Sequence, residues 1–102
     1  MSVIGINAFS DHVRISTASD SAGDSAAYID FTIKADGTPL TVTSLEDDDD
    51  STIWLYVSET ITTGQVITLT YVPNSERWIT APHLAPAYVL FAMTDAAVTN
   101  TT

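Results

Sequence analysis

Apolar and polar residues alternate with a period of two along most of this chain, and this alternation restricts the fold more than any other feature. In the stretch HVRIS, Val13 and Ile15 share one face, while the polar residues around them share the other. The same pattern continues through residues 28–45, 51–57 and 65–72. Because successive side chains of a β-strand point to opposite faces, the pattern predicts strands with one buried face. We therefore expect an all-β fold.

Turn residues divide the predicted strands. The pair Asp36-Gly37 favours a two-residue hairpin turn, because both central positions of that turn need a positive φ. Gly64 separates two further strands, and Pro73 ends the next one. The spacing predicts an antiparallel β-sandwich or barrel with a last strand through 89–93 and a further piece through 97–99. The expected inward residues are Val13, Ile15, Ile29, Phe31, Ile33, Leu40, Val42, Ile53, Leu55, Val57, Ile67, Leu69 and Tyr71.

The length and composition indicate one globular domain. The chain has 102 residues, of which 45% are apolar and 16% charged. This is enough apolar material for one core and too little length for a second. We expect residues 1–102 to form a single domain, with residues 1–10 as a candidate extended arm that could add a strand to a neighbour's sheet.

The charge balance excludes several classes of partner. Thirteen acidic residues oppose three basic ones, Arg14, Lys34 and Arg77, for a net charge of -10. Nucleic acids and anionic membranes attract clustered basic residues, so we expect neither as a partner. No apolar run approaches the roughly 18 residues of a membrane helix, and the N-terminus lacks the pattern of a signal peptide.

Five consecutive acids, Glu46, Asp47, Asp48, Asp49 and Asp50, precede the apolar run TIWLYV. Calcium loops space their ligands at alternating positions and include a glycine at the bend, which this run does not do. We expect a solvated acidic hairpin tip. Weak, nonspecific binding of divalent cations stays open as an alternative.

The sequence offers no recognisable catalytic or metal-binding set. Its two histidines, His12 and His83, have no cysteine to complete a zinc site. No nucleophile elbow of the G-x-S-x-G type is present. We expect no enzymatic activity, no metal and no cofactor. His12 alternates with inward Val13, so we expect it on the surface of its strand.

Aromatic residues on the outward face are the candidates for an interface. Trp54 and Tyr56 alternate with the inward residues of their strand. The atypical segment 75–90 adds four more candidates: Arg77, Trp78, His83 and Tyr88. Exposed Trp and Tyr often anchor protein interfaces. The alternative is an intrachain cluster in which other parts of the chain cover Trp54.

The segments ETITTGQVITLTYVPNS and AMTDAAVTNTT resemble the SwmB-like repeats of bacterial surface proteins. The likeness is strongest over Thr60–Asn74 and Ala92–Asn100, covers Tyr28–Asn100 as a whole, and includes the strand at Val13 more loosely. It implies an Ig-like antiparallel sandwich of about seven strands. It carries no catalytic residues, since copies of this repeat act as spacers or adhesion modules.

Two departures from the repeat pattern shape the functional expectation. The segment SERWITAPHLAPAYVL is longer and more aromatic than the usual closing loop, and only one copy is present. A single copy without a signal favours a bacteriophage virion component, such as a capsid decoration or cement protein that binds major capsid subunits. Such a protein could also form a homo-oligomer. The alternatives are an adhesion or spacer module at the bacterial cell surface, or a carbohydrate-binding sandwich using Trp54, Tyr56 and Trp78.

Overall fold

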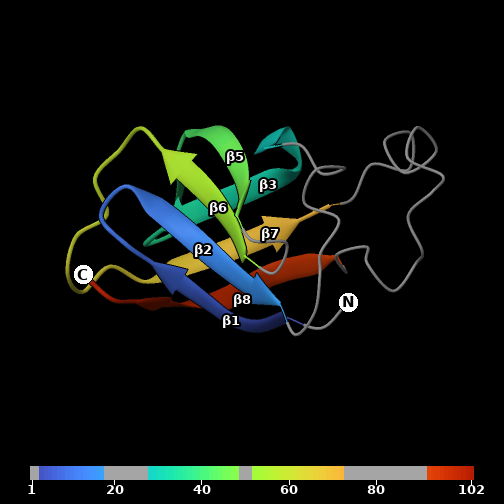
Figure 1. Cartoon of the computed structure of the whole chain (residues 1–102). Coiled ribbons are helices and arrows are strands. Elements are labelled where there is room, and N and C mark those ends of the chain that lie inside the picture. Colours follow the sequence, from blue (N-terminus) through green and yellow to red (C-terminus); the bar gives the residue numbers. More distant parts are fainter. Residues whose placement is uncertain (1–2, 18–27, 49–51, 73–91) are drawn as a thin grey trace, which may run out of the picture.

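The computed structural model describes residues 3–17, 28–48, 52–72 and 92–102, which form eight strands and one short 3-10 helix (Figure 1). The prediction of an all-β fold is confirmed for these residues. The elements are β1 (Val3–Ala8), β2 (His12–Thr17), η2 (Tyr28–Asp30), β3 (Phe31–Ala35), β4 (Thr38–Pro39), β5 (Val42–Asp48), β6 (Thr52–Val57), β7 (Ile67–Tyr71) and β8 (Met93–Asn100).

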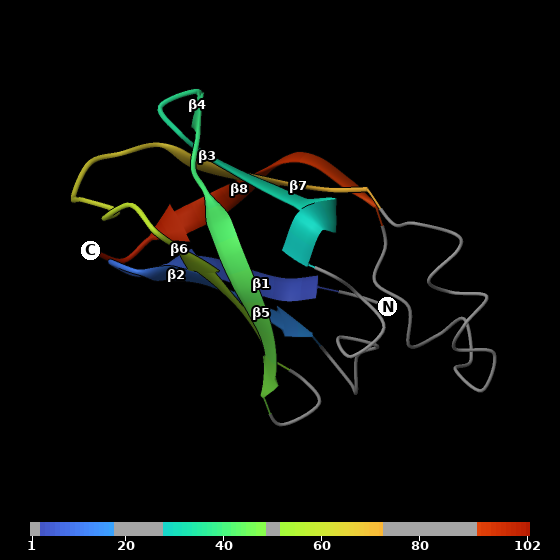
Figure 2. The ribbon, with the colours of Figure 1, turned by 90° about the horizontal axis from the view of Figure 1, so that it is seen from above.

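The strands belong to one continuous mixed sheet in the order β4-β3-β7-β8-β1-β2-β6-β5. Every neighbouring pair is antiparallel except β1 and β8, which run parallel. The sheet curls so that β2, β6 and β5 face β3 and β7 across the core (Figures 1 and 2). Sequence alone predicts an antiparallel sandwich of about seven strands, whereas the described residues form one curled sheet of eight strands with one parallel pair. The sandwich and its Ig-like topology stay predictions.

The core lies inside this curl and is built mainly from the inward residues of four strands, with Ala8 of β1, Val98 of β8 and Ile61 added to them. Val13, Ile15, Ile53, Leu55 and Leu69 are fully buried. The predicted inward faces of β2, β3, β6 and β7 are thereby confirmed, because all their apolar inward residues belong to the same core cluster. Each fully buried aliphatic side chain contributes about 1.5–3 kcal/mol, so this cluster supplies most of the driving force for folding.

Three details differ from the expectation. Ile29 is 65% exposed, because Tyr28–Asp30 form a 3-10 turn in which strand alternation does not apply. Residues 3–8 of the expected arm instead form β1, an interior strand that pairs with both β2 and β8. The last strand runs unbroken over Met93–Asn100, and residues 89–91 of the expected strand lie outside the described part.

The Asp36-Gly37 turn has the predicted geometry. Their φ angles are 51° and 83°, and the turn joins β3 to β4 through the facing pair Ala35 and Thr38. Asp36 also extends the pairing of β3 with β7. Its amide donates to the Val66 carbonyl at 2.8 Å, and its carboxylate accepts from the Val66 amide at 2.8 Å.

The parallel pairing of β1 with β8 sets the direction of the chain through the molecule. Asn7 and Ala8 at the end of β1 face Thr99 and Asn100 at the end of β8. We term the end of the molecule where β1 begins the proximal end, and the end where both strands finish the distal end. Figure 1 shows the C-terminus at the distal end, to which the arrow of β1 also points.

Candidate functional site

The outward face of β2 and β6 carries the largest group of aromatic and basic side chains among the described residues. The antiparallel register places His12 opposite Tyr56 and Arg14 opposite Trp54. These four residues point away from the core because their neighbours along each strand point into it. Cross-strand neighbours on one face lie within contact distance, so the register alone brings the four side chains together.

Phe9, in the turn between β1 and β2, completes what we term the aromatic stack: Phe9, His12, Arg14, Trp54 and Tyr56. The His12 ring lies between the Phe9 ring at 4.7 Å and the Trp54 ring at 4.6 Å, with interplanar angles of 14° and 13°. The Arg14 guanidinium carbon lies 4.6 Å from the Phe9 centroid and 4.4 Å from the Trp54 centroid. Both β2 side chains are therefore held between two nearly parallel aromatic rings.

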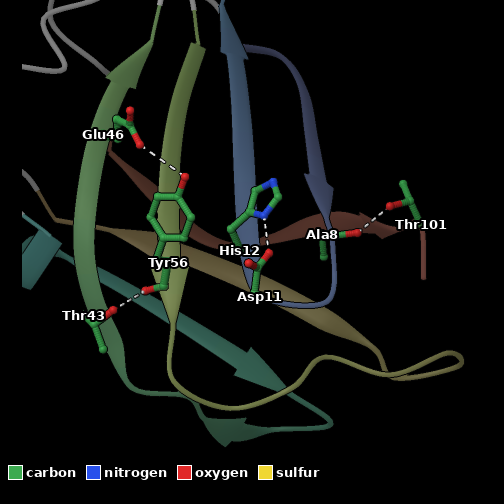
Figure 3. Close-up of polar contacts among 7 residues, drawn as sticks. All are labelled: Ala8, Asp11, His12, Thr43, Glu46, Tyr56 and Thr101. Carbon is green, nitrogen blue, oxygen red and sulfur yellow. Dashed lines mark hydrogen bonds and ion pairs between the residues drawn. The ribbon is translucent and has the colours of Figure 1, made fainter.

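His12 is on the outward face as predicted, but it is only 8% exposed, so the expectation of a surface residue is wrong. The rings of Phe9 and Trp54 cover its two faces. Its Nδ1 atom lies 2.6 Å from the Asp11 carboxylate (Figure 3). This hydrogen bond is the main reason that the pKa of Asp11 lies below its ordinary value. The Nε2 atom of His12 is buried and has no hydrogen-bond partner among the described residues.

Arg14 has no acidic partner among the described residues, although the chain carries thirteen acids. Within the described part of the chain, its Nε atom and the Trp54 Nε1 atom are buried and have no hydrogen-bond partner. Contacts with the faces of two rings take the place of an ion pair, and each such contact is worth about 0.5–2 kcal/mol. The guanidinium is suited to this position because it is planar and more weakly hydrated than an ammonium group.

The aromatic stack determines how much of the Trp54 ring is open to a partner. One face of Trp54 is occupied by His12 and Arg14 of the same chain, which fits the intrachain alternative for Trp54. A sugar would need an open ring face, and the stack leaves Trp54 with at most one. Tyr56 is partly exposed and donates a hydrogen bond to Glu46 at 3.2 Å (Figure 3). The other candidates, Arg77, Trp78, His83 and Tyr88, lie outside the described residues.

The acidic run begins inside a strand. Glu46, Asp47 and Asp48 are the last residues of β5, and their backbones pair with Trp54, Ile53 and Thr52 of β6. Asp49 and Asp50 lie outside the described residues. Glu46 is exposed, as expected of this run, but it also holds the Tyr56 hydroxyl. The solvated tip itself stays a prediction.

Two kinds of feature are absent from the described ranges, residues 3–17, 28–48, 52–72 and 92–102. Within them, no three His, Asp or Glu side chains gather closely enough to hold a metal ion. The same ranges contain no helix with the length and apolar character needed to cross a membrane.

A second polar group ties the distal end together, and we term it the distal joint: Ala8, Asn100, Thr101, Thr102 and the loop 60–66. The Ala8 carbonyl accepts from the Thr101 amide at 2.9 Å and from its hydroxyl at 2.7 Å (Figure 3). Ala8 is fully buried. The Ile61 amide of the loop donates to the Ser10 carbonyl at 2.8 Å, which links the loop to the turn after β1.

Asn100 uses all the hydrogen-bonding capacity of its side-chain amide in the distal joint. Its Nδ2 donates to the carbonyls of Thr62 at 2.9 Å and Gln65 at 3.0 Å. Its Oδ1 accepts from the Thr102 amide at 3.0 Å and the Thr102 hydroxyl at 2.5 Å. Two donors and two acceptor sites are the full inventory of an asparagine side chain. Asn100 therefore fixes both the loop and the chain leaving β8.

Sequence reasoning missed most of these residues. Phe9, His12 and Arg14 were not among the candidate interface residues, although the alternation of HVRIS already placed His12 and Arg14 on the outward face. Their contacts with Trp54 and Tyr56 follow from the pairing of β2 with β6. This pairing is a tertiary contact that local alternation does not predict. Asn100 is the last residue of the AVTN stretch of the repeat-like pattern. Its hydrogen bonds to the loop 60–66 could be recognised only from the position of that loop in the structure.

No protein-family model matches the sequence, and no curated protein matches it. Among solved structures, the N-terminal part of the bacterial S-layer protein SbsC superimposes with a TM-score of 0.61 and 20% sequence identity. The match covers 70% of this chain and 18% of that chain, so this chain spans under a fifth of its structural neighbour. At this identity the likeness is one of fold. The chain is thus similar in fold to a domain-sized part of a bacterial surface protein.

Proposed function

We propose that this chain is a non-enzymatic structural module that acts as a spacer or adhesion link in a bacterial cell-surface protein. The observation that carries the proposal is the parallel pairing of the first and last described strands. The fold likeness to part of an S-layer protein supports the same class of function.

Parallel neighbouring strands place the two connections of a module at opposite ends. If β1 and β8 were antiparallel, the chain would enter and leave at the same end, and linked modules would fold back on one another. In the observed arrangement the chain enters at Val3 and leaves after Asn100. Six residues of strand at about 3.3 Å each separate these points by roughly 20 Å along β1. Modules joined in this way extend in one direction.

The edges of the sheet are suited to a module that does not pair sideways with its copies. The edge strand β4 has two residues and ends in Pro39, which has no amide to donate. The other edge strand, β5, ends in Glu46, Asp47 and Asp48. Short strands, proline and charge are the devices by which natural sheets prevent edge-to-edge association. Contacts at the two ends are therefore favoured over lateral sheet extension.

A capsid decoration or cement protein is the same kind of module placed on a virion, where its partners would be major capsid subunits. The S-layer likeness favours the cell surface over the virion. A carbohydrate-binding role has less support, because His12 and Arg14 occupy a face of Trp54.

Quantitative mass spectrometry of native source material tests the proposal. The material is separated into cell envelope, virus particles and soluble protein, and peptides of this chain are measured in each fraction. Enrichment in the envelope, with peptides that join this sequence to further modules, is the expected result. Recovery in particles at a fixed ratio to a coat protein would replace the cell-surface role with a virion role. Recovery in the soluble fraction alone would overturn both.

A further inference from the structure

We infer that the contact between β1 and β8, with the distal joint, makes this module resistant to mechanical extension along its chain direction. The inference deepens the proposed function, because tension reaches a module only when it is held at both ends. It concerns a property of the fold that can be measured on the isolated chain.

The direction of the applied force relative to β1 and β8 determines how the contact between these strands is loaded. Tension applied through the proximal end of β1 and the distal end of β8 draws the two strands past each other in opposite directions. Their facing pairs, Asn7 with Thr99 and Ala8 with Asn100, are then loaded at the same time. Bonds loaded together must break together, whereas bonds at the open end of a hairpin break one after another.

The distal joint strengthens this short ladder. The two hydrogen bonds from Thr101 converge on the Ala8 carbonyl, at 2.9 Å from the amide and 2.7 Å from the hydroxyl. Ala8 has no exposed surface, so water has little access to replace a stretched bond. The bond from Ile61 to Ser10 and those from Asn100 to the loop add a second link between the β1 end and β8.

The rest of the sheet directs tension to this contact. The remaining pairings on either side, β1 with β2 and β7 with β8, are antiparallel and longer, with five and four facing pairs against two between β1 and β8. The sheet has one half formed by β4, β3, β7 and β8 and another formed by β1, β2, β6 and β5. Among the described strands, the pairing of β8 with β1 joins these halves. The halves otherwise meet through the core, the distal joint and the packing of β5 against η2 and β3.

Single-molecule force spectroscopy tests the inference by changing only the direction of pulling. The chain contains no cysteine, so thiol handles can be placed without background. One form has handles at the two chain ends. The second keeps the C-terminal handle and moves the other to S10C, an exposed position at the distal end. Pulling this second form peels β1 from β8 instead of shearing them.

The mean unfolding force is expected to be lower in the S10C form than in the end-to-end form. Equal forces in the two geometries would overturn the inference. This result would leave the proposed function standing if the chain were still found in the cell envelope, so the two failures are distinguishable.

A pair of matched variants then tests the distal joint. T101V removes the hydroxyl donor to Ala8 and keeps the shape of the side chain. T99V makes the same change two residues earlier, where the hydroxyl is exposed and makes no hydrogen bond among the described residues. At constant force, T101V is expected to unfold about fivefold faster than the parent, as the loss of one ordinary hydrogen bond implies, and T99V at the parental rate. Equal rates for all three forms would show that the Thr101 hydroxyl carries none of the tension.

Discussion

Replacing Asn100 by aspartate tests whether the distal joint is held by the geometry described above. The change keeps the shape of the side chain and replaces only the Nδ2 donor with an oxygen. Two carbonyls, those of Thr62 and Gln65, then face an acceptor at distances of 2.9 and 3.0 Å instead of a donor. The Oδ1 side, which accepts from Thr102, is unchanged.

The expected cost follows from the bonds that are lost. Each ordinary hydrogen bond contributes about 0.5–1.5 kcal/mol net, so two lost bonds predict a loss of about 1–3 kcal/mol in the free energy of unfolding. Repulsion between the carboxylate and the two carbonyls adds to this at neutral pH. In a domain of this size, 1 kcal/mol corresponds to about 4–8 °C in Tm. Urea unfolding followed by circular dichroism measures the difference directly.

The pH dependence of N100D provides a sharper test. Carbonyl neighbours favour the protonated form of the new carboxyl, so its pKa in the folded state should lie above its value in the unfolded state. A group with a raised folded pKa stabilises the fold at low pH and loses this contribution as the pH rises. The deficit of N100D relative to the parent should therefore grow as the pH rises through about 4–6.

N7D is the matched control. Asn7 lies on β1 between Thr99 of β8 and Arg14 of β2, and its side chain makes no hydrogen bond with the described residues. Because the Arg14 guanidinium favours a negatively charged neighbour, the added carboxylate should cost little here and its cost should not grow as the pH rises. If N7D and N100D lose equal stability, the added charge explains the effect and the distal joint does not. If N100D is as stable as the parent at pH 7, Asn100 does not hold the loop.

Three further predictions address the core, the aromatic stack and the exposed acids. Leu55→Ala should lower the free energy of unfolding by about 2–5 kcal/mol in urea because Leu55 is fully buried, and Leu45→Ala, at a partly buried edge position, should cost less; equal costs would contradict the placement of the core. Arg14→Lys keeps the charge but loses the planar group between Phe9 and Trp54, so we expect a loss of about 1 kcal/mol, and unchanged stability would show that the stacking contributes nothing. Hydrogen bonds lower the pKa of Asp11, mainly from His12, and of Glu59, mainly from the Thr41 amide. Both carboxylates therefore stabilise the fold above their unfolded pKa values and lose this contribution as the pH falls below about 4. Asp11→Asn and Glu59→Gln should each reduce the amount by which the free energy of unfolding falls at acid pH. An equally large fall in both variants and the parent would refute the assignment.

The elements that the sequence predicts correctly are those set by local alternation. Ile53, Leu55 and Val57 follow a strict period of two, and each is buried as that period requires. Ile29 continues the same period in the sequence, but the chain turns at Tyr28–Asp30 and leaves it exposed. Alternation identifies a face only where the backbone is extended, and the pattern itself does not report where the extended segment begins.

The parallel contact of β1 with β8 has no local signal at all. Ala8 and Asn100 are separated by nearly the whole chain, and the contact depends on the order in which the other strands pair. Gly5 interrupts the apolar pattern of the first strand, and the register shifts between Val3 and Gly5. Residues 1–10 are a candidate extended arm by sequence, whereas Val3–Ala8 form an interior strand that links the two halves of the sheet.

The aromatic stack shows why outward-facing aromatic residues do not by themselves predict a partner. Alternation places Trp54 on the outer face, and an exposed tryptophan is a plausible anchor for another protein. On a twisted sheet, however, large planar side chains on adjacent strands can cover one another. His12 and Arg14 do this for one face of Trp54. The rings of Phe9 and Trp54 in turn remove His12 from solvent, although it points away from the core. Under the proposed function, contacts with neighbouring modules would therefore form at the two ends of the module, where the chain enters and leaves, and not on the aromatic face.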